Sequence, residues 1–358
     1  MSQANKTKVE LLIDDDSNGI MLAWPDVYET KSYWKNILET YYQLINDCLI
    51  NDKHIILITR KNRDIKKDLR NINKNLNVLI DKKSYFHIYK LNYDDIWLRD
   101  QGPLMLKESI CDYNFSLFRF NGYGNKYNYA NDKTLSKKII EKYNFDHKKN
   151  HKIPLNIFKD LVIEPGNIVY DDRLCIVNKN PLMMHNNLEW TDINNILKEG
   201  FEKILKSKYI VMDLGSLSGD DTNGHIDNLI RLEGSNNLYY MATNDKLHPD
   251  YKILNDLENK IMNTNFNDRT ISPIYHDSID IVKSSNNEIL PFSYLNYIKI
   301  GNFIFMPSNK NTNENKKDEI RNIFNNDNIY FIDITGLLNQ KGGLHCCSMN
   351  FREDKILQ

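Results

Sequence analysis

Cys346 is the first residue of this sequence whose surroundings suggest chemistry, because it follows the sequence Gly-Gly-Leu-His at 342–345. Glycines allow close backbone approach where a side chain must be presented to a pocket. A nucleophilic cysteine reacts as the thiolate, which an adjacent cation favours, including a cationic substrate. Cys346 is therefore a candidate nucleophile, although a buried inert cysteine is the commoner explanation for one taken alone. Cys347 would point elsewhere on a strand and is expected to be structural.

Three acids form the second candidate group, since Asp100, Glu164 and Asp227 recur at intervals of about 60 residues. His225 lies two positions before Asp227. If this segment opens a strand, alternation places both side chains on one face, whereas a helix would separate them by about 200°. Taken alone, a His-x-Asp pair is weak evidence, because many such pairs are structural or bind metal.

A recurring order of elements positions these residues. Short apolar runs joined by polar turns predict hairpins, and apolar residues at helical spacing follow each of them. A single apolar strand comes next. The predicted hairpins span 167–178, 229–242 and 297–306; the helices span 190–205, 251–262 and 316–324; the single strands span 209–214 and 329–334.

The N-terminal half follows the same order less regularly. It predicts a longer hairpin over 96–120, a helix over 135–143 and a strand over 161–163. Before these, a strand over 21–24, a helix over 33–49 and a strand over 54–59 fit less well.

The unit strand, strand, helix, strand thus recurs about every 60 residues, and about five units fit the chain. A fixed period is typical of repeat architectures, in which equivalent positions converge around the axis. Asp100, Glu164 and Asp227 would then meet in one pocket. Because no linker rich in Pro, Gly or Ser separates the units, we expect one α/β domain over residues 1–358. An ordinary α+β domain with coincidental spacing is the alternative.

Composition narrows the class of protein. The 358 residues carry a formal net charge of -1, so no global field favours nucleic acid or an anionic membrane. No apolar run approaches the ~20 residues needed to cross a bilayer, and we expect a cytosolic protein. The cysteines are odd in number and lack the paired spacing of a zinc site: Cys48, Cys111, Cys175, Cys346 and Cys347.

Several segments resemble the motifs of agmatine deiminases, members of the guanidino-group-modifying, peptidyl-arginine deiminase-like superfamily. Trp97–Pro103 is similar to their Trp-x-Arg-Asp-x-Gly-Pro motif, and Phe118–Tyr127 to their Phe-Asn-x-Trp-Gly-x-Lys element. Gly219–Asn228 resembles the His-x-Asp segment, and Gly343–Cys346 the nucleophile motif. Met21–Pro25 also matches. The ordered set covers nearly the whole chain.

The resemblance implies the five-bladed α/β propeller, or pentein, fold of guanidino-modifying enzymes. Two positions depart from the family pattern. Pro165 stands where the family usually has the first Gly of Glu-Gly-Gly-Asn, and Tyr123 stands in place of a Trp. Both departures affect the expected fit of the substrate more than the chemistry, since the ionisable residues are intact.

By the same resemblance, the Cys346 thiolate attacks the guanidinium carbon of agmatine, a small cationic substrate. Asp100 and Asp227, with Glu164 nearby, hold the guanidinium nitrogens. His225 protonates the departing ammonia and then activates water, and Asp227 could also orient it. The products are N-carbamoylputrescine and ammonia, an activity associated with putrescine and polyamine biosynthesis. No metal or organic cofactor is implied, and a homodimer stays open.

Three residues are predicted to bind the rest of the substrate. Asp221 would meet the distal amine, Trp97 would pack on the aliphatic stem, and Asn167 would complete the pocket. Arg99 could instead bind the carboxylate of free arginine, although its neighbours suggest a structural ion pair.

Four alternatives remain at this stage. The chain could be a deiminase acting on arginine, peptidyl-arginine or methylated arginine, an amidinotransferase, or an inactive guanidino-binding homologue. The fourth is a metal hydrolase using Asp220, Asp221, His225 and Asp227, which lacks further His ligands at useful spacing.

Overall fold

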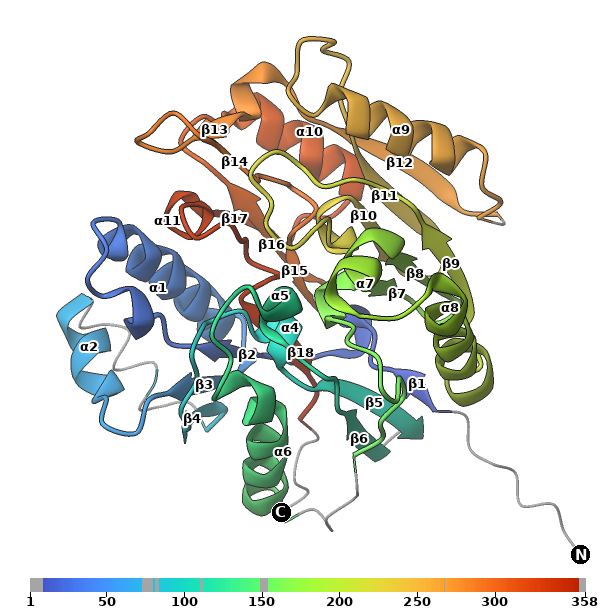
Figure 1. Cartoon of the computed structure of the whole chain (residues 1–358). Helices are drawn as coiled ribbons and strands as arrows, with labels where there is room; N and C mark the ends of the chain where they lie inside the picture. The colour runs from blue at the N-terminus through green and yellow to red at the C-terminus, as the bar shows by residue number, and fades with distance from the viewer. Residues whose placement is uncertain are drawn as a thin grey trace, which may run out of the picture.

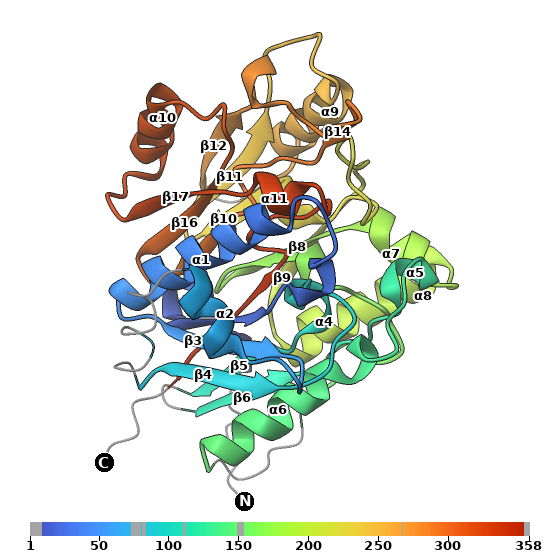
Figure 2. The ribbon, with the colours of Figure 1, turned by 90° about the vertical axis from the view of Figure 1, so that its left-hand side faces the viewer.

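The computed structural model describes residues 9–72, 80, 84–109, 112–148, 154–266 and 268–353. The predicted α/β class is confirmed, with helices connecting the strands of several small sheets. Figure 1 shows α1, α6, α8, α9 and α10 around the outside of the molecule, whereas α4 and α5 lie near its middle. Figure 2 gives the same arrangement from the side.

Three sheets repeat one pattern, in which an antiparallel hairpin is followed by a helical crossover and a parallel third strand. The predicted unit is therefore confirmed in this part of the chain. The first sheet contains β7 (Ile168–Tyr170), β8 (Leu174–Asn178) and β9 (Lys208–Met212). Its crossover contains α7 (Lys179–His185), α8 (Trp190–Lys198) and the π-helical turn η5 (Glu199–Ile204). The second contains β10 (Ile230–Glu233), β11 (Asn237–Ala242), α9 (Tyr251–Met262) and β12 (Thr270–Tyr275). The third contains β15 (Ile298–Ile300), β16 (Phe303–Ser308), α10 (Glu314–Phe324) and β17 (Ile329–Asp333).

A fourth sheet joins the two ends of the chain in the order β18-β2-β3-β4. The helix α1 packs over it with apolar residues at helical spacing, among them Ile37, Tyr41, Leu44 and Cys48, all fully buried. Every residue of β2 and β18 is buried as well. The elements of this region are β2 (Gly19–Ala23), α1 (Trp34–Ile50), β3 (His54–Thr59), α2 (Ile65–Ile72), β4 (Phe86–Lys90) and β18 (Ser348–Phe351).

The fifth sheet has the order β1-β5-β6 and is antiparallel throughout. It consists of β1 (Glu10–Leu11), β5 (Leu104–Ser109) and β6 (Asp112–Ser116), and α6 (Leu135–Asp146) follows. Short elements complete the description: α4 (Leu98–Gln101), α5 (Gly122–Asn125), α11 (Thr335–Leu338) and the ribbon of β13 (Val282–Lys283) and β14 (Ile289–Leu290).

Three sequence predictions are wrong in detail. The predicted hairpin over 96–120 begins with the helical turn α4, so that only its later part is strand. The predicted strand over 161–163 is reduced to one bridge between Arg119 and Val162. His225 and Asp227 do not open a strand, because Ile226–Asn228 forms a 3-10 turn before β10. Turn hydrogen bonds between near neighbours override β propensity in such short segments.

The length and composition of a helix decide whether it can span a membrane. None of the helices in the described residues is long and apolar enough to cross a membrane.

Candidate active site

Cys346 lies in the turn that leads into β18 and is 8% exposed. It lines a cavity of about 230 Å³ together with Asp100, Trp97 and Tyr123. Cys347 belongs to the same turn rather than to a strand, and its thiol donates to the Leu344 carbonyl at 3.2 Å. Consecutive turn residues point in different directions, so only the first of the two thiols reaches the cavity.

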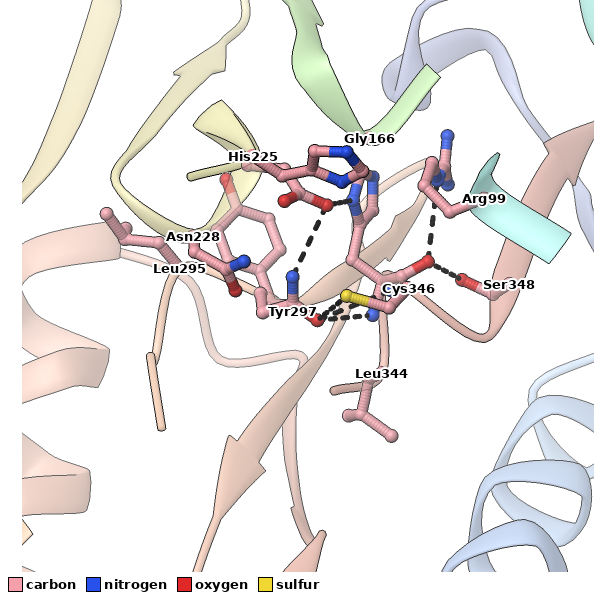
Figure 3. A network of polar contacts seen from close by, with 12 residues as sticks. Arg99, Gly166, His225, Asn228, Leu295, Tyr297, Leu344, Cys346 and Ser348 are labelled. Atoms are coloured by element: carbon pink, nitrogen blue, oxygen red, sulfur yellow. Dashed lines mark hydrogen bonds and ion pairs between the residues drawn. The ribbon is translucent and has the colours of Figure 1, made fainter. Parts of the chain in front are cut away.

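The side chain of Asn296, just before β15, holds this turn in place. Its Oδ1 accepts the backbone N–H groups of His345 at 3.0 Å and Cys346 at 3.3 Å, and the Cys346 thiol at 3.4 Å. Its Nδ2 donates to Asp227 Oδ2 at 3.3 Å. Because backbone N–H groups can only donate, they fix which end of the amide faces the nucleophile. The dashed lines that end on Cys346 in Figure 3 mark these contacts.

Asp227 is fully buried and bonds to His345, the residue before Cys346. Its Oδ2 lies 2.6 Å from His345 Nδ1, in addition to the Asn296 contact. Burial lowers the pKa of His345 well below its usual range, so the ring is neutral and donates from Nδ1. The hydrogen bonds of Asp227 thus connect it to His345 and Asn296, whereas the sequence suggested that it orients His225.

Asp100 in α4 brings three segments together at the cavity wall. Its Oδ2 accepts the Tyr123 hydroxyl at 2.8 Å, and its Oδ1 accepts the Gly166 N–H at 3.2 Å. The same Oδ1 lies 3.5 Å from His225 Nδ1. Asp100 is 2% exposed and His225 is 1% exposed, so little water screens this ion pair.

Glu164 lies behind Asp100 and is fully buried. Its Oε1 lies 2.9 Å from Nδ1 of His185 at the end of α7, and its Oε2 lies 3.8 Å from His225 Nε2. The second distance is too long for a hydrogen bond, so His225 attracts this oxygen through charge alone. The other ring nitrogen of His185 lies 3.0 Å from Asn223 Nδ2.

The buried charges shift one another's pKa values in directions that favour an ion pair. Burial opposes a charged His225, but Asp100, Glu164 and Asp227 outweigh it and raise the pKa of His225 to about 10. Burial likewise opposes ionised Glu164, yet the hydrogen bond from His185 and the positive charge of His225 lower its pKa to about 2. At neutral pH the site therefore contains an imidazolium and an ionised Glu164.

For the remaining groups of the site, neighbouring charges offset the effect of burial on the pKa only in part. It raises the pKa of Asp227 to about 7 and that of Asp100 above its usual value, each partly offset by His225. Burial and the carboxylates of Asp227 and Asp100 raise the pKa of the Cys346 thiol well above its usual value. The thiol is therefore protonated in the empty site, and a cation bound beside it would favour the thiolate.

Two glycines allow the close approaches on which this geometry depends. A Cβ on Gly166 would lie 2.5 Å from Asp100 Oδ1 and 2.8 Å from His225 Nδ1. A Cβ on Gly342 would lie 2.4 Å from the Trp97 ring. Pro165, which precedes Gly166, occupies the first position of a 3-10 turn, where an N–H would have no partner within the turn. This departure from the family pattern is thus accommodated locally.

We call the part of the cavity wall that includes the exposed residues Tyr127 and Lys341 the mouth; Asp95, Asp221 and Trp97 also belong to it. The Asp221 carboxylate accepts the Tyr127 hydroxyl at 2.5 Å and lies 3.6 Å from Lys126 Nζ. Asp95 accepts the hydroxyl of Tyr28, and burial raises the pKa of Asp95 to about 6.

Most of the predicted site residues converge, although they divide into two groups. Cys346, Asp100, Trp97 and Asp221 line the cavity itself. The remaining catalytic candidates pack directly behind Asp100 and Cys346 through the contacts described above: Glu164, His225 and Asp227. We call Cys346, Asp100, Glu164, His225 and Asp227 the inner cluster.

One residue, Asn167, lies elsewhere than predicted, and Arg99 agrees with its prediction only in part. Both amide atoms of Asn167 bond to the backbone of Asn178, at 2.8 and 3.2 Å, so this side chain supports the β7–β8 hairpin instead of facing the cavity. Arg99 is 2% exposed and donates to Asn350 Oδ1 at 2.9 Å and to the His345 carbonyl at 3.4 Å. It is structural, as its neighbours suggested, but these acceptors are neutral.

The residues considered for a metal hydrolase are used otherwise. Asp220 accepts the Gly224 N–H at 2.7 Å and the Thr222 hydroxyl at 2.8 Å, which fixes the loop before His225. Within the described ranges, no group of three or more His, Cys, Asp or Glu side chains has an arrangement that could hold a metal ion. Cys111 lies outside the described residues, and Cys48, Cys175, Cys346 and Cys347 are buried free thiols.

The sequence did not identify three residues that contact the inner cluster: His185, His345 and Asn296. His345 stood next to the nucleophile, and Asn296 stands within the run Ser293–Tyr297 before a predicted strand. His185 had no such signal, because its partner Glu164 is remote in sequence and only the packing of α7 joins them.

Comparisons with known proteins show the family and the fold of this chain. Residues 15–351 match the family model described as Porphyromonas-type peptidyl-arginine deiminase. An agmatine deiminase from C. jejuni with substrate bound superposes with a TM-score of 0.78 at 20% identity, over 96% of both chains. An agmatine deiminase of Enterococcus faecalis gives a TM-score of 0.77 at 14% identity, over 97% of this chain and 96% of that one. A Mycoplasma mycoides protein provisionally named agmatine deiminase is 23% identical over 291 residues, which are 72% of this chain and 75% of the relative.

Proposed function

Because this chain belongs to the Porphyromonas-type peptidyl-arginine deiminase family of guanidino-modifying hydrolases, we propose that it is an agmatine deiminase. The observation that carries the proposal is the distribution of charge along one cavity. Cys346 and Asp100 line its inner part, and Asp95 and Asp221 line its mouth. A substrate with a cation at each end, joined by an aliphatic stem that Trp97 can cover, fits this distribution. Agmatine has that form.

The reaction begins when the bound guanidinium favours the thiolate of Cys346, whose proton leaves to solvent. The sulfur attacks the guanidinium carbon and forms a carbon–sulfur bond. Protonated His225 gives its proton to the terminal nitrogen, so the carbon–nitrogen bond breaks and ammonia departs. An amidino-cysteine intermediate remains. Asp100 and the charges behind it stabilise the positive charge on the substrate during this step.

Water completes the reaction. His225, now neutral, takes a proton from the water molecule that attacks the amidino carbon. The carbon–sulfur bond breaks, the thiolate of Cys346 is regenerated, the remaining hydroxyl proton passes to solvent, and the ureido product leaves. With agmatine and one water molecule, the products are N-carbamoylputrescine and ammonia.

For the architecture, we infer that the five sheets are the blades of an α/β propeller within one domain. Three sheets share the same strand order, and the fourth and fifth include the N-terminal strands. Residues of the inner cluster come from joints between these sheets: Asp100 from α4 before β5, Glu164 before β7, His225 and Asp227 before β10, and Cys346 before β18.

The test is turnover of a panel of guanidino compounds by the purified protein. Agmatine, arginine, a peptidyl-arginine substrate and methylarginine are each incubated with wild type and Cys346→Ser, and ureido product and ammonia are measured. The proposal expects agmatine to have the highest kcat/KM and the variant to be inactive. Preference for another compound would retain the chemistry but contradict the substrate, and glycine-dependent turnover would indicate an amidinotransferase.

Lys341 supports a second candidate function. It is exposed and lines the same cavity, so its ammonium group could meet the carboxylate of free arginine. Lys341→Met distinguishes the two functions. An arginine deiminase would lose affinity for arginine in this variant, whereas an agmatine deiminase would keep or improve its KM for agmatine, because a like charge near the amine is removed.

A further inference from the structure

His185 is a buried histidine of the site that has no part in the reaction described above. It ends α7, is 4% exposed and contacts Glu164 on one side and Asn223 on the other. We propose that His185 is a positioning residue, which holds the Glu164 carboxylate in the orientation that keeps its second oxygen available to His225 and the substrate cation. The inference deepens the proposed function and depends on it only for the identity of the substrate.

The two contacts fix the proton of His185. Glu164 Oε1 is an acceptor, so the Nδ1 atom at 2.9 Å donates to it. Asn223 Nδ2 is a donor, so the Nε2 atom at 3.0 Å accepts from it. With the Asn223 amide in this orientation, a ring with its proton on Nδ1 and none on Nε2 satisfies both contacts. Asn223 is in turn held by its backbone carbonyl, which accepts from Asn180 Nδ2 at 2.8 Å.

The Oε1 atom of Glu164 accepts the hydrogen bond from His185, whereas its Oε2 atom accepts none in the described residues. Glu164 Oε2 is buried and has no hydrogen-bond partner in the described part of the chain, and its nearest cation is His225 Nε2 at 3.8 Å. A buried carboxylate oxygen without a donor is unfavourable unless a positive charge lies beside it. A guanidinium nitrogen or the imidazolium would supply that charge, provided that the carboxylate does not rotate. The bond from His185 prevents this rotation.

Several charged or titratable groups surround Glu164, and each acts in a definite direction. His185 on α7 and His225 before β10 favour its ionised form. Asp100 on α4 interacts unfavourably with it across His225, and Tyr123 on α5 has its ring 6.0 Å from the His185 ring and 6.1 Å from the His225 ring. Loss of the His185 donor would leave desolvation and Asp100 with less opposition, so the pKa of Glu164 would rise.

Two variants separate positioning from packing. In His185→Asn the amide nitrogen occupies the place of Nδ1 and can still donate to Glu164. In His185→Gln the amide reaches the place of Nε2, beside Asn223, and no donor remains for Glu164. A hydrogen bond to a charged group changes rates by about 10- to 100-fold when lost. We expect kcat/KM for agmatine to fall by about that factor in His185→Gln and by less than about fivefold in His185→Asn.

The pH profile provides the readout that a packing role would not change. In His185→Gln the higher pKa of Glu164 should move the acid limb of kcat/KM to higher pH, so the loss is larger at pH 5 than at pH 8. Thermal unfolding shows whether both variants are folded. Equal losses in the two variants, an unchanged acid limb, or no loss in His185→Gln would overturn the inference.

A chemical probe keeps the inference testable if wild type turns over none of the guanidino compounds. Chloroacetamidine is a cationic alkylating agent that resembles a guanidinium, and iodoacetamide is neutral. Their rates at Cys346 are measured by mass spectrometry for wild type and both variants. We expect His185→Gln to lower the chloroacetamidine rate about tenfold or more while the iodoacetamide rate stays constant. No change in the ratio would contradict the inference, whereas the panel alone decides the proposed function.

Discussion

The inner cluster and the mouth of the cavity use the same residue types in different ways. Asp100, Glu164 and Asp227 in the inner cluster are at most 2% exposed, and each accepts at least one hydrogen bond from a neighbouring segment. Asp221 at the mouth has 17% of its side chain exposed, and its partners Tyr127 and Lys126 are 43% and 45% exposed. Buried charges interact strongly and must be fixed, whereas exposed charges are screened. We therefore propose that chemistry depends on the inner cluster and substrate choice on the mouth.

The largest loss of kcat should come from substitution of Cys346, the proposed nucleophile. Cys346→Ser replaces the thiol with a hydroxyl that burial keeps protonated, so kcat should fall by about 10⁴-fold or more. Ammonia release measures the loss. Cys347→Ser, in which the neighbouring thiol is changed, is the control and should retain most of the activity; a comparable loss in it would contradict the assignment of Cys346.

The next largest loss of kcat should come from substitution of Gly166, whose backbone lies against Asp100 and His225. In Gly166→Ala the new Cβ would push Asp100 and His225 apart, and displacements of about 1 Å can cost about 100-fold in rate. Gly215→Ala is the matched control, because its Cβ would find no atom closer than 3.6 Å. Steady-state kinetics should show a loss in kcat only for the first variant, and equal behaviour of the two would show that the inner cluster tolerates movement.

The raised pKa of Cys346 gives a pH dependence. Well below its pKa the thiolate fraction rises tenfold per pH unit, so alkylation of the empty enzyme by iodoacetamide should rise about tenfold per unit between pH 7 and 9. The rate is followed by mass spectrometry, with Cys346→Ser to subtract the other thiols. A plateau reached below pH 8 would mean that the inner cluster already holds a thiolate without substrate.

A change at the mouth should affect binding more than chemistry. In Asp221→Asn the attraction for a distal amine is lost but the inner cluster is intact, so KM for agmatine should rise about tenfold with kcat within about threefold, as for one charge-assisted contact. KM for arginine should change less. A fall in kcat without a change in KM would contradict the separation of the two regions.

The smallest effect is expected at Pro165, which lies beside the inner cluster but makes no hydrogen bond there. Pro165→Gly should leave kcat/KM within about threefold and lower the free energy of unfolding by about 1 kcal/mol, because the unfolded chain gains freedom. Denaturant unfolding and agmatine kinetics on one preparation measure both. A large kinetic loss would show that the ring itself shapes the pocket.

Local sequence patterns predicted the regular units well and the joints between them poorly. The helix predicted over 251–262 is α9, and the hairpins around 167–178 and 297–306 are present. Such elements follow from the spacing of apolar residues along a short window. The turn at His225–Asp227 and the helical turn α4 were missed, because hydrogen bonds between near neighbours form them and such short turns leave no periodic pattern of apolar residues.

The residues of the candidate site were likewise predicted well in some cases and poorly in others. The nucleophile, Asp100 and Asp221 were found from motif order, and the structure places all three on one cavity. Asn167 was assigned to the substrate, whereas its amide is used by Asn178. His185 left no signal, since nothing in the sequence near it indicates that α7 packs against Glu164. These partners are 11 and 21 positions apart in the chain, and a single sequence does not give the distances between such side chains.

The pairing of β18 with β2 also affects how the protein is made. This sheet joins strands at opposite ends of the sequence, with Ser348 opposite Leu22 and Phe351 opposite Gly19. Contacts so far apart in the chain form late, because closing long loops costs entropy before the contacts compensate for it. During synthesis on the ribosome, β2 must therefore wait for its partner. Cys346 lies in the turn just before that strand, so a nascent or truncated chain that ends before this turn would have neither a completed sheet nor the proposed nucleophile.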